Sequence, residues 1–323
     1  MGTAFSPAGR NTADGIEKPP SPRATLDSRR GARARSRRRK NLAWVLFFLL
    51  PSAAPLMVFT IVPMISSLWV SLHKWNLISP MEWIGVDNYR NLLTDPKTAE
   101  VFQHTLIYVV GYLPLVYVGG LALALALNAR LHGQAFFRAT YFLPVVTSWV
   151  VVALVWKWML NPNNGLVNQI LGALGLPQPG WWTDPAWALP SVILSSAWKD
   201  LGFVMVILLA GLQAIPADLL SAAEVDGANA WQRFLNVTVP CLRPTTFFVT
   251  VMLTIGSFKV FDLILVMTNG GPGQSTLVLS QYIYTKGFVE NKLGYASAVS
   301  IVLFLICISI TVVQFIVNKR RAD

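Results

Sequence analysis

The feature that most constrains this chain is a series of long apolar runs separated by short polar segments. A helix needs about 20 consecutive apolar residues to cross the hydrocarbon core of a bilayer. The runs that reach or approach this length lie at residues 43–72, 103–128, 140–160, 186–213, 245–268 and 295–317. Only 13% of all residues are charged, against about a quarter in a typical soluble domain. The sequence therefore predicts an all-α, polytopic membrane protein with six transmembrane helices.

Residues 1–40 differ in composition from the rest of the chain. They hold eleven of the 26 lysine and arginine residues and three of the 15 acidic ones, together with prolines and serines and without apolar periodicity. This composition predicts a disordered tail, with the membrane domain at residues 41–323. A basic run directly before a first span is typical of a positive-inside anchor that touches anionic lipid. We therefore expect membrane lipid as its partner and no nucleic acid.

Basic residues also mark alternate loops. A short loop around Arg130, a second loop around Arg233 and the final residues NKRRAD are basic, whereas residues 161–184 contain no lysine or arginine. Under the positive-inside rule, basic loops stay on the cytoplasmic side. We therefore expect a multi-pass protein with both termini, and the segment 216–244, in the cytoplasm.

The segment 216–244 is compact and polar, although it connects two apolar runs. Its first part, PADLLSAAEVDGA, begins with proline and an acid, as first helical turns often do, and Gly227 stands where a helix end favours glycine. A second short helix, NAWQRFLNVTV, is expected to follow and to end near Pro240. The pattern fits two interfacial helices that cap the bundle. It equally fits a rigid element whose alanine-rich face docks in a groove of a partner.

A resemblance favours the docking element. The segment resembles the cytoplasmic EAA loop of permease subunits from binding-protein-dependent ABC importers of the carbohydrate and glycerol-phosphate type. The matching residues are Ala222, Ala223, Gly227, Val237, Val239 and Pro240. Four further stretches resemble the same permeases: WIGVDNYRNLLTDP (83–96), ATYFLPVVTSWVVVALVWKWML (139–160), AGLQAIPADL (210–219) and GSFKVFDLILVMTNGGPGQST (256–276). The resemblance covers residues 41–323.

The resemblance implies a type I ABC importer fold and a role as half of the translocation pathway for a sugar or sugar-like solute. It implies a bacterial or archaeal inner membrane. The implied partners are a second, homologous permease, ATPase subunits that bind ATP and magnesium, and an extracytoplasmic solute-binding protein. The 216–244 loop would then be the coupling element that docks on the ATPase. Its candidate docking residues are Ser221, Ala222, Ala223, Glu224, Asp226, Gly227 and Pro240.

One position departs from the family pattern. The leading glutamate of the EAA loop is Ser221 in this chain, and Glu224 or Asp226 would have to replace it. Loss of one exposed ion pair costs about 0–1 kcal/mol, so docking is still expected.

The sequence shows no catalytic apparatus of its own. NGGPGQST (269–276) lacks the lysine that a phosphate-binding loop requires after a strand. The histidines do not have the spacing of metal ligands, and no Ser-His-Asp set or carboxylate pair stands out. We therefore expect a transport subunit without catalytic residues, metal or cofactor, driven by ATP hydrolysis in a separate polypeptide.

Charged residues within two apolar runs are the candidates for solute contact. Lys199 and Asp200 lie near the middle of the fourth run, and Lys259 and Asp262 lie past the middle of the fifth, on one expected helical face. Because charges inside a membrane face a cavity or one another, the four residues predict either a structural ion-pair cluster or a polar solute path. In related importers, substrate contacts fall on the helices that flank the coupling loop. Two tyrosines, Tyr108 and Tyr112, lie one helical turn apart and could stack on a sugar ring. The full set of candidates for the solute path is Tyr108, Tyr112, Trp198, Lys199, Asp200, Ser257, Phe258, Lys259 and Asp262.

Other functions stay open at this point. A glycerophosphodiester or polyol importer would use the same architecture, and the two lysines in the path slightly favour an anionic solute. A secondary transporter would need its own ion-coupling residues and would gain nothing from a docking element. A membrane enzyme such as a lipid-linked glycosyltransferase would need catalytic acids in an aqueous loop, where the chain has only scattered ones such as Asp87 and Asp95.

Overall fold

The computed structural model of the 323-residue chain describes residues 2, 44–45, 47–129 and 133–320. The chain divides into two compact units, Met1–Met64 and Ile65–Asp323, here called unit 1 and unit 2. Apart from Gly2, the tail predicted at residues 1–40 lies outside the described residues, so its disorder stays a prediction.

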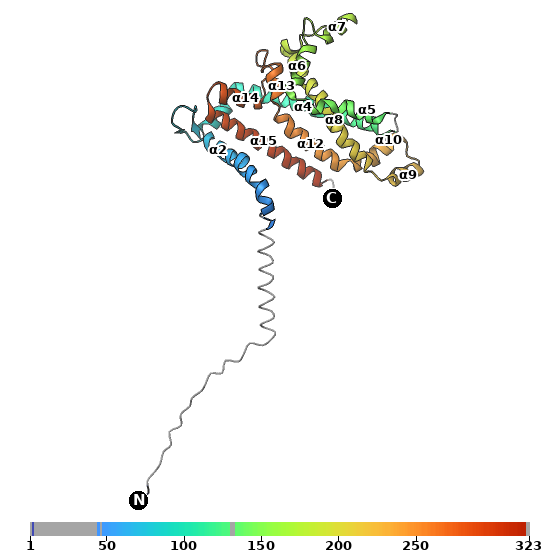
Figure 1. Cartoon of the computed structure of the whole chain (residues 1–323), viewed down its shortest axis with the longest axis horizontal. Helices are drawn as coiled ribbons and strands as arrows, with labels where there is room; N and C mark the ends of the chain where they lie inside the picture. Colours follow the sequence, from blue (N-terminus) through green and yellow to red (C-terminus); the bar gives the residue numbers. More distant parts are fainter. Residues whose placement is uncertain (1, 3–43, 46, 130–132, 321–323) are drawn as a thin grey trace. The chain divides into compact units, whose positions relative to one another are not determined.

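The described residues are mainly helical, which confirms the predicted fold class (Figure 1). The strands found in these ranges are β1 (His73–Lys74) and β2 (Glu82–Trp83), which pair as an antiparallel hairpin. Within the described ranges, four helices are long and apolar enough to cross a membrane, at Phe47–Ser71, Pro96–Asn128, Pro185–Gln213 and Leu293–Arg320. Two bent helix pairs raise the possible number of spans to six.

The first span, Phe47–Ser71, contains a wider helical turn. Within it the π-helix η1 (Met57–Ile61) leads directly into α2 (Val62–Ser71). Pro63 follows this turn and has no amide hydrogen to donate. A π turn is a local adjustment that re-satisfies such a helix without ending it.

The two longest helices of unit 2 begin at the same dipeptide, Asp-Pro. Asp95 caps α4 (Pro96–Asn128) by accepting a hydrogen bond from the amide of Lys97 at 3.0 Å. Asp184 caps α8 (Pro185–Gln213) in the same way from Ala186 at 2.9 Å. An acid at the N-cap followed by proline is a strong helix start. For this reason α4 begins before the apolar run at 103–128.

The expected third and fifth spans are divided. Residues 140–160 fall on α5 (Gln134–Val146) and α6 (Trp149–Met159), which are bent by 101°. Residues 245–268 fall on α12 (Arg243–Phe258) and α13 (Asp262–Met267). The expectation that Lys259 and Asp262 share one helical face is therefore wrong, because α12 ends before both of them.

Short helices occupy the remaining connections. They are α3 (Asp87–Thr94), α7 (Leu166–Ala173), η2 (Trp181–Thr183), α9 (Ala217–Val225), α10 (Ala230–Arg233), η3 (Phe234–Thr238), α11 (Val239–Cys241), α14 (Leu279–Tyr284) and η4 (Thr285–Val289). The last long helix is α15 (Leu293–Arg320), close to the predicted span at 295–317.

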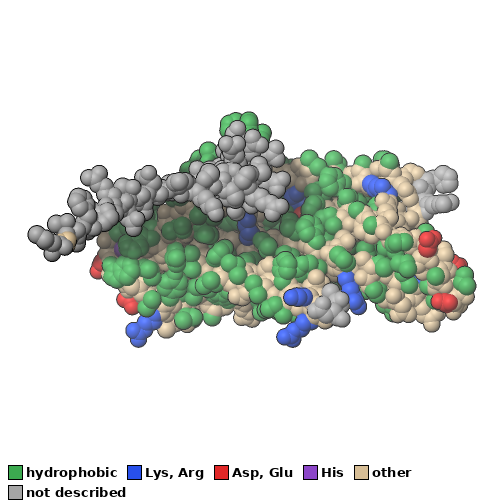
Figure 2. Space-filling model, turned by 90° about the horizontal axis from the view of Figure 1, so that it is seen from below, with side chains coloured by type: hydrophobic (Ala, Val, Ile, Leu, Met, Phe, Trp, Pro, Cys, Tyr) green, Lys and Arg blue, Asp and Glu red, His purple; other side chains and the backbone are tan. Residues whose placement is uncertain are grey.

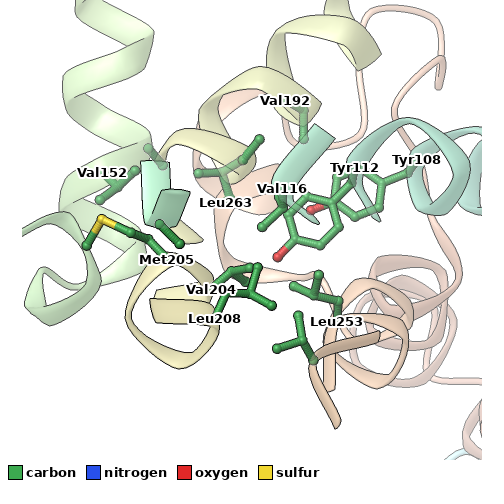
Figure 3. Close-up of a cluster of buried hydrophobic side chains, with 14 of the residues drawn as sticks. Tyr108, Tyr112, Val116, Val152, Val192, Val204, Met205, Leu208, Leu253 and Leu263 are labelled. Atoms are coloured by element: carbon green, nitrogen blue, oxygen red, sulfur yellow. The ribbon is translucent and has the colours of Figure 1, made fainter. Parts of the chain in front are cut away.

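Among the three long helices α4, α8 and α15 of unit 2, α8 is the most buried. In its most apolar 18-residue window 56% of residues are buried, against 6% in α15. Its Val204, Met205 and Leu208 meet Val116 of α4 and Leu253 of α12 in the hydrophobic core (Figure 3). Hydrophobic side chains also dominate the face seen in Figure 2, with most acidic ones near its two ends. An apolar outer surface is what a helical bundle surrounded by lipid tails presents.

Candidate functional site

A cavity of about 170 Å³ lies where α4 and α8 meet the break between α12 and α13. We call it the bundle cavity. Its lining residues are Tyr108, Tyr112, Trp149, Asp200, Gly256, Lys259, Val260, Phe261, Asp262 and Leu263. The structure therefore brings together five of the nine residues that the sequence proposes for a solute path: Tyr108, Tyr112, Asp200, Lys259 and Asp262.

Tyr112 and Asp200 form one polar wall of the bundle cavity. The Tyr112 hydroxyl donates a hydrogen bond to Oδ2 of Asp200 at 2.5 Å and so joins α4 to α8. The Tyr112 ring lies against the Tyr108 ring, with centroids 5.4 Å apart and planes 11° from parallel (Figure 3). Both tyrosines are buried. Their rings thus stack on each other, whereas the sequence suggested that they stand open to a sugar ring.

The break between α12 and α13 forms the opposite wall. Lys259 and Asp262 flank it, and both line the cavity. The carbonyl of Val260, inside the break, accepts a hydrogen bond from the Ser280 hydroxyl. Among the described residues, the salt bridges include none of the four intramembrane charges, so the ion-pair cluster weighed above does not form there. The side chains of Lys259 and Asp262 remain available to a bound molecule.

The other four predicted path residues do not line the cavity. Lys199 is buried and donates to the carbonyl oxygens of Pro144 and Val145. Trp198 packs edge-to-face on Trp156, with ring centroids 5.7 Å apart. The remaining two, Ser257 and Phe258, are buried in α12. None of these four residues faces the cavity, although Lys199 and Ser257 are next in sequence to the lining residues Asp200 and Gly256.

Sequence reasoning missed Trp149, the aromatic residue that α6 contributes to the cavity. Trp149 is the first residue of α6 and reaches this position because the chain turns by 101° after α5. The available signal was weak: Thr147 and Ser148 form a short polar interruption soon after Pro144 in an otherwise apolar run.

The segment 216–244 forms an exposed pair of helices at the end of unit 2 opposite α14 (Figure 1). Every residue of α9 is at least partly exposed. The helix ends in a Schellman motif, in which Gly227 donates to the Glu224 carbonyl at 3.0 Å and Ala228 to the Ala223 carbonyl at 2.9 Å. Gly227 has φ of 80°, a conformation that glycine adopts without the steric penalty of other residues. The predicted role of this glycine as a helix stop is confirmed.

The second helix of the segment is built from three consecutive elements. Asn229 and Gln232 form a capping box at the start of α10, and the chain continues through η3 into α11, where Pro240 occupies the first turn. A salt bridge of 2.6 Å joins Nη1 of Arg233 to Oε2 of Glu224 and so ties the second helix to α9.

This salt bridge distinguishes the two acids that were weighed as substitutes for the missing glutamate. Glu224 is engaged by Arg233, whereas Ser221 and Asp226 are exposed. Within the described part of the chain, the Asp226 carboxylate has no hydrogen bond or ion pair. Of these two acids, Asp226 is therefore the one that is left for an external contact, beside the small side chains of Ala222 and Ala223.

A larger cavity, of about 440 Å³, lies where the β1–β2 hairpin, α3 and the start of α15 meet. We call it the hairpin cavity. Its lining is rich in lysine, amide and aromatic side chains, among them Lys74, Trp75, Asn91, Lys286, Lys292 and Tyr295. Such a mixture offers both polar and apolar contacts to a bound partner.

Glu290 bridges two lysines that line the hairpin cavity. Its Oε2 lies 2.8 Å from Nζ of Lys286 and 2.9 Å from Nζ of Lys292. Burial opposes ionisation of Glu290, but hydrogen bonds and the positive charges of the two lysines outweigh burial. The pKa of Glu290 therefore lies below its ordinary value.

Comparisons with known proteins bear on both the fold and these sites. A family model described as binding-protein-dependent transport system inner membrane component matches residues 116–323. The chain is 36% identical over 272 residues to YurN, a probable ABC transporter permease protein of Bacillus subtilis (strain 168), covering 83% of this chain and 93% of that protein. It is 34% identical over 280 residues to MalF, the trehalose/maltose transport system permease protein of Thermococcus litoralis, covering 85% and 93%.

A solved structure shares the fold. It is a bacterial alginate ABC transporter in complex with an alginate pentasaccharide-bound periplasmic protein. The similarity has a TM-score of 0.78 at 26% sequence identity and covers 88% of this chain and 96% of that one.

Proposed function

Since this chain belongs to the family of binding-protein-dependent inner membrane transport components, we propose that it forms half of the pathway by which an ATP-driven importer moves a sugar or sugar-like solute. The chain is a membrane-embedded ABC transporter permease with the type I importer fold. Relatives are named for trehalose and maltose and for alginate. The observation that carries the proposal for the solute path is the bundle cavity, a polar site within an apolar bundle.

The groups in the bundle cavity favour a hydroxylated solute. Asp200 and Asp262 offer carboxylate acceptors, Lys259 offers donors and Trp149 offers an aromatic face. Because Lys199 is bonded to carbonyl groups outside the cavity, the cavity has two carboxylates and one ammonium. This charge balance removes the slight preference for an anion that two path lysines would give, so an anionic solute is no longer favoured over a neutral sugar.

The exposed 216–244 loop is the proposed coupling element. Its small residues Ala222 and Ala223 allow close approach of a partner groove, and the Schellman turn at Gly227 and the Glu224–Arg233 salt bridge make the loop rigid. An ATPase subunit that binds ATP and magnesium is the proposed partner at this surface. A rigid loop can transmit closure of an ATPase dimer to α8 and α12, which it connects.

The basic loops support an orientation with both termini in the cytoplasm of a bacterial or archaeal cell. In that orientation the hairpin cavity is extracytoplasmic. We assign to its face the docking of the solute-binding protein, and to a second homologous permease the other half of the pathway. The solved alginate transporter, which is in complex with a periplasmic protein, supports an assembly of this kind.

The test is affinity purification of the tagged chain from its native membrane, with identification of the co-purifying proteins and assay of their ATPase activity. We expect an ATPase, a second permease and a solute-binding protein. Gly227→Pro should abolish recovery of the ATPase, because proline cannot adopt φ of 80°. Gly175→Pro is the matched control, since Gly175 also has positive φ and open space around it but lies in the 161–184 segment.

Recovery of the chain alone would refute the proposed assembly. Recovery of the solute-binding protein allows the solute to be identified, because this protein can be titrated by calorimetry with trehalose, maltose and alginate oligosaccharides. A glycerophosphodiester and a polyol belong in the same panel, since binding of either in place of every sugar would replace the sugar assignment.

A further inference from the structure

Lys199 is charged, buried and outside the bundle cavity. Only 4% of its surface is exposed. Its ammonium donates hydrogen bonds to the carbonyl oxygens of Pro144 at 3.2 Å and Val145 at 3.0 Å, and it lies 4.6 Å from the ring centroid of Trp149. Pro144 and Val145 are at the end of α5 and Trp149 is at the start of α6. One side chain of α8 thus contacts both sides of the 101° bend.

The chemistry of a broken membrane helix explains why a lysine is useful here. A helix that ends inside a bilayer leaves carbonyl groups that need donors, and its C-terminal end carries partial negative charge. Thr147 supplies two donors, its amide to Pro144 at 3.2 Å and its hydroxyl to Leu143 at 3.3 Å. Lys199 adds a positive charge and further donors at the same end. These contacts compensate for the burial of the ammonium and stabilise the bend.

Lys199 and Asp200 follow each other on α8 but hold different neighbours. Asp200 binds Tyr112 of α4 and lines the bundle cavity, whereas Lys199 binds the end of α5. Nearby on α8, Gly202 permits the close packing of α5, because a Cβ at this position would overlap the carbonyl of Tyr141. The bent helix pair is therefore fixed to α8 immediately beside the cavity.

We propose that Lys199 is a positioning residue of the solute path: it fixes the bend between α5 and α6 and so presents Trp149 to the bundle cavity. Lys199 itself does not contact the solute. The role in transport rests on the proposed function, but the placement of Trp149 can be tested without any solute.

The experiment labels the assembled complex with 5-fluorotryptophan and records ¹⁹F NMR spectra. The Trp149 resonance is the one that Trp149→Phe removes. In the unaltered chain a ring that is held in one position should give a single resonance, and its width is the reference for the variants. Lys199→Met should split this resonance or change its width, because the ring then samples several positions. Lys199→Arg, which keeps the charge and two or more donors, should restore the reference line.

Lys157 provides a matched control. Its ammonium lies 5.2 Å from the ring centroid of Trp182 and 3.4 Å from the carbonyl oxygen of Val266. Lys157→Met should alter the Trp182 resonance and leave the Trp149 resonance unchanged. If Lys199→Met does not assemble, Lys199→Gln replaces it, with an intermediate change in the Trp149 resonance expected because an amide can still donate to one carbonyl.

A single Trp149 resonance that shifts but keeps the reference width without Lys199 would overturn the proposal. The second readout is transport into proteoliposomes. The transported solute is the sugar, among those in the calorimetry panel, that the unaltered complex carries. Lys199→Met should lower the maximal rate by at least about tenfold, and Lys199→Arg should recover most of it. A resonance that is split or changed in width, with an unchanged rate, would refute the role in transport. Absence of transport by the unaltered complex, together with the expected spectra, would refute the proposed function and leave the positioning of Trp149 established.

Discussion

At the scale of single residues, the intramembrane charges of α8 are each held by a hydrogen-bonding partner. Asp200 accepts from the hydroxyl of Tyr112, and Lys199 donates to two backbone carbonyls. Burying a charge is costly unless it is paired or hydrogen-bonded. Removal of a partner of such a charge should therefore lower the free energy of unfolding more than removal of a hydrogen bond between neutral groups.

Tyr112→Phe tests this expectation. The substitution removes the donor to Asp200 and should lower the free energy of unfolding in detergent by about 1–3 kcal/mol, because a partly buried carboxylate is left without its partner. Tyr117→Phe is the comparison, since it removes a 2.8 Å hydrogen bond between neutral hydroxyl groups of Tyr117 and Thr246 and should cost about 1 kcal/mol or less. Equal losses of unfolding free energy in the two variants would contradict the prediction that a hydrogen bond to a charged group contributes more than one between neutral groups.

The Glu290 bridge should depend on pH. Because the folded-state pKa of Glu290 lies below its ordinary value, ionised Glu290 stabilises the fold above the ordinary pKa, and this contribution is lost as the pH falls through the folded-state pKa. Hydrogen exchange of residues 285–292, corrected for intrinsic rates, should therefore accelerate on acidification. Glu290→Gln should remove that step and cost about 1 kcal/mol or less at neutral pH. If hydrogen exchange in Glu290→Gln kept the same pH dependence, that dependence would have to arise from another titrating group.

At the scale of elements, the packing of α5 on α8 depends on the missing side chain of Gly202. Gly202→Ala should force the helices apart, since its methyl group would overlap the backbone carbonyl of Tyr141, which cannot rotate away as a side chain can. We expect a loss of about 1–3 kcal/mol in unfolding free energy. Gly256→Ala, with open space around the new methyl group, should change stability by well under that amount. The measurement is thermal unfolding of both purified variants.

The effect of having Ser221 in place of the family's glutamate can be measured as a change in the affinity of the 216–244 loop for the ATPase subunit. Ser221→Glu restores the glutamate of the family pattern and should raise the affinity for the ATPase subunit by no more than about fivefold, because an exposed ion pair contributes up to about 1 kcal/mol. Asp226→Asn should lower the affinity by a similar factor if Asp226 supplies the acidic contact. Binding assays with the isolated ATPase subunit check both values. An unchanged affinity for Asp226→Asn would show that Asp226 does not supply the acidic contact to the partner.

Sequence patterns predicted some elements better than others. Continuous apolar runs and the Asp-Pro starts locate α4 and α8, and Gly227 locates the end of α9, because each of these signals is local. The bend after α5 is different. Its carbonyl groups are satisfied by Lys199, more than fifty residues further along the chain. The local sequence cannot show that such a donor will be present, so Trp149 was missed as a cavity residue and Lys199 was assigned to the path itself.

At the scale of the whole molecule, the coupling loop and the hairpin side lie at opposite ends of unit 2 (Figure 1). The proposed orientation therefore predicts opposite accessibility. A membrane-impermeant maleimide should label the exposed Cys241 in inside-out vesicles only, and Asn291→Cys at the hairpin cavity in right-side-out vesicles only. Cys307→Ser removes the other thiol in both cases. The reverse pattern would place the coupling loop outside the cell and contradict the assembly proposed above.

The partners of α8 also bear on how the chain is made. Tyr112, Pro144 and Val145 all precede Lys199 and Asp200, so a ribosome synthesises them first. A charged residue at the centre of a lone helix opposes insertion from the translocon by about 2.5–3.5 kcal/mol. Each of these two charges instead meets groups that are already in the bilayer when α8 emerges. During translation from the N-terminus, the groups that bind Lys199 and Asp200 are thus present before α8 inserts. A rearranged chain in which α8 came first would have to insert both charges unpaired.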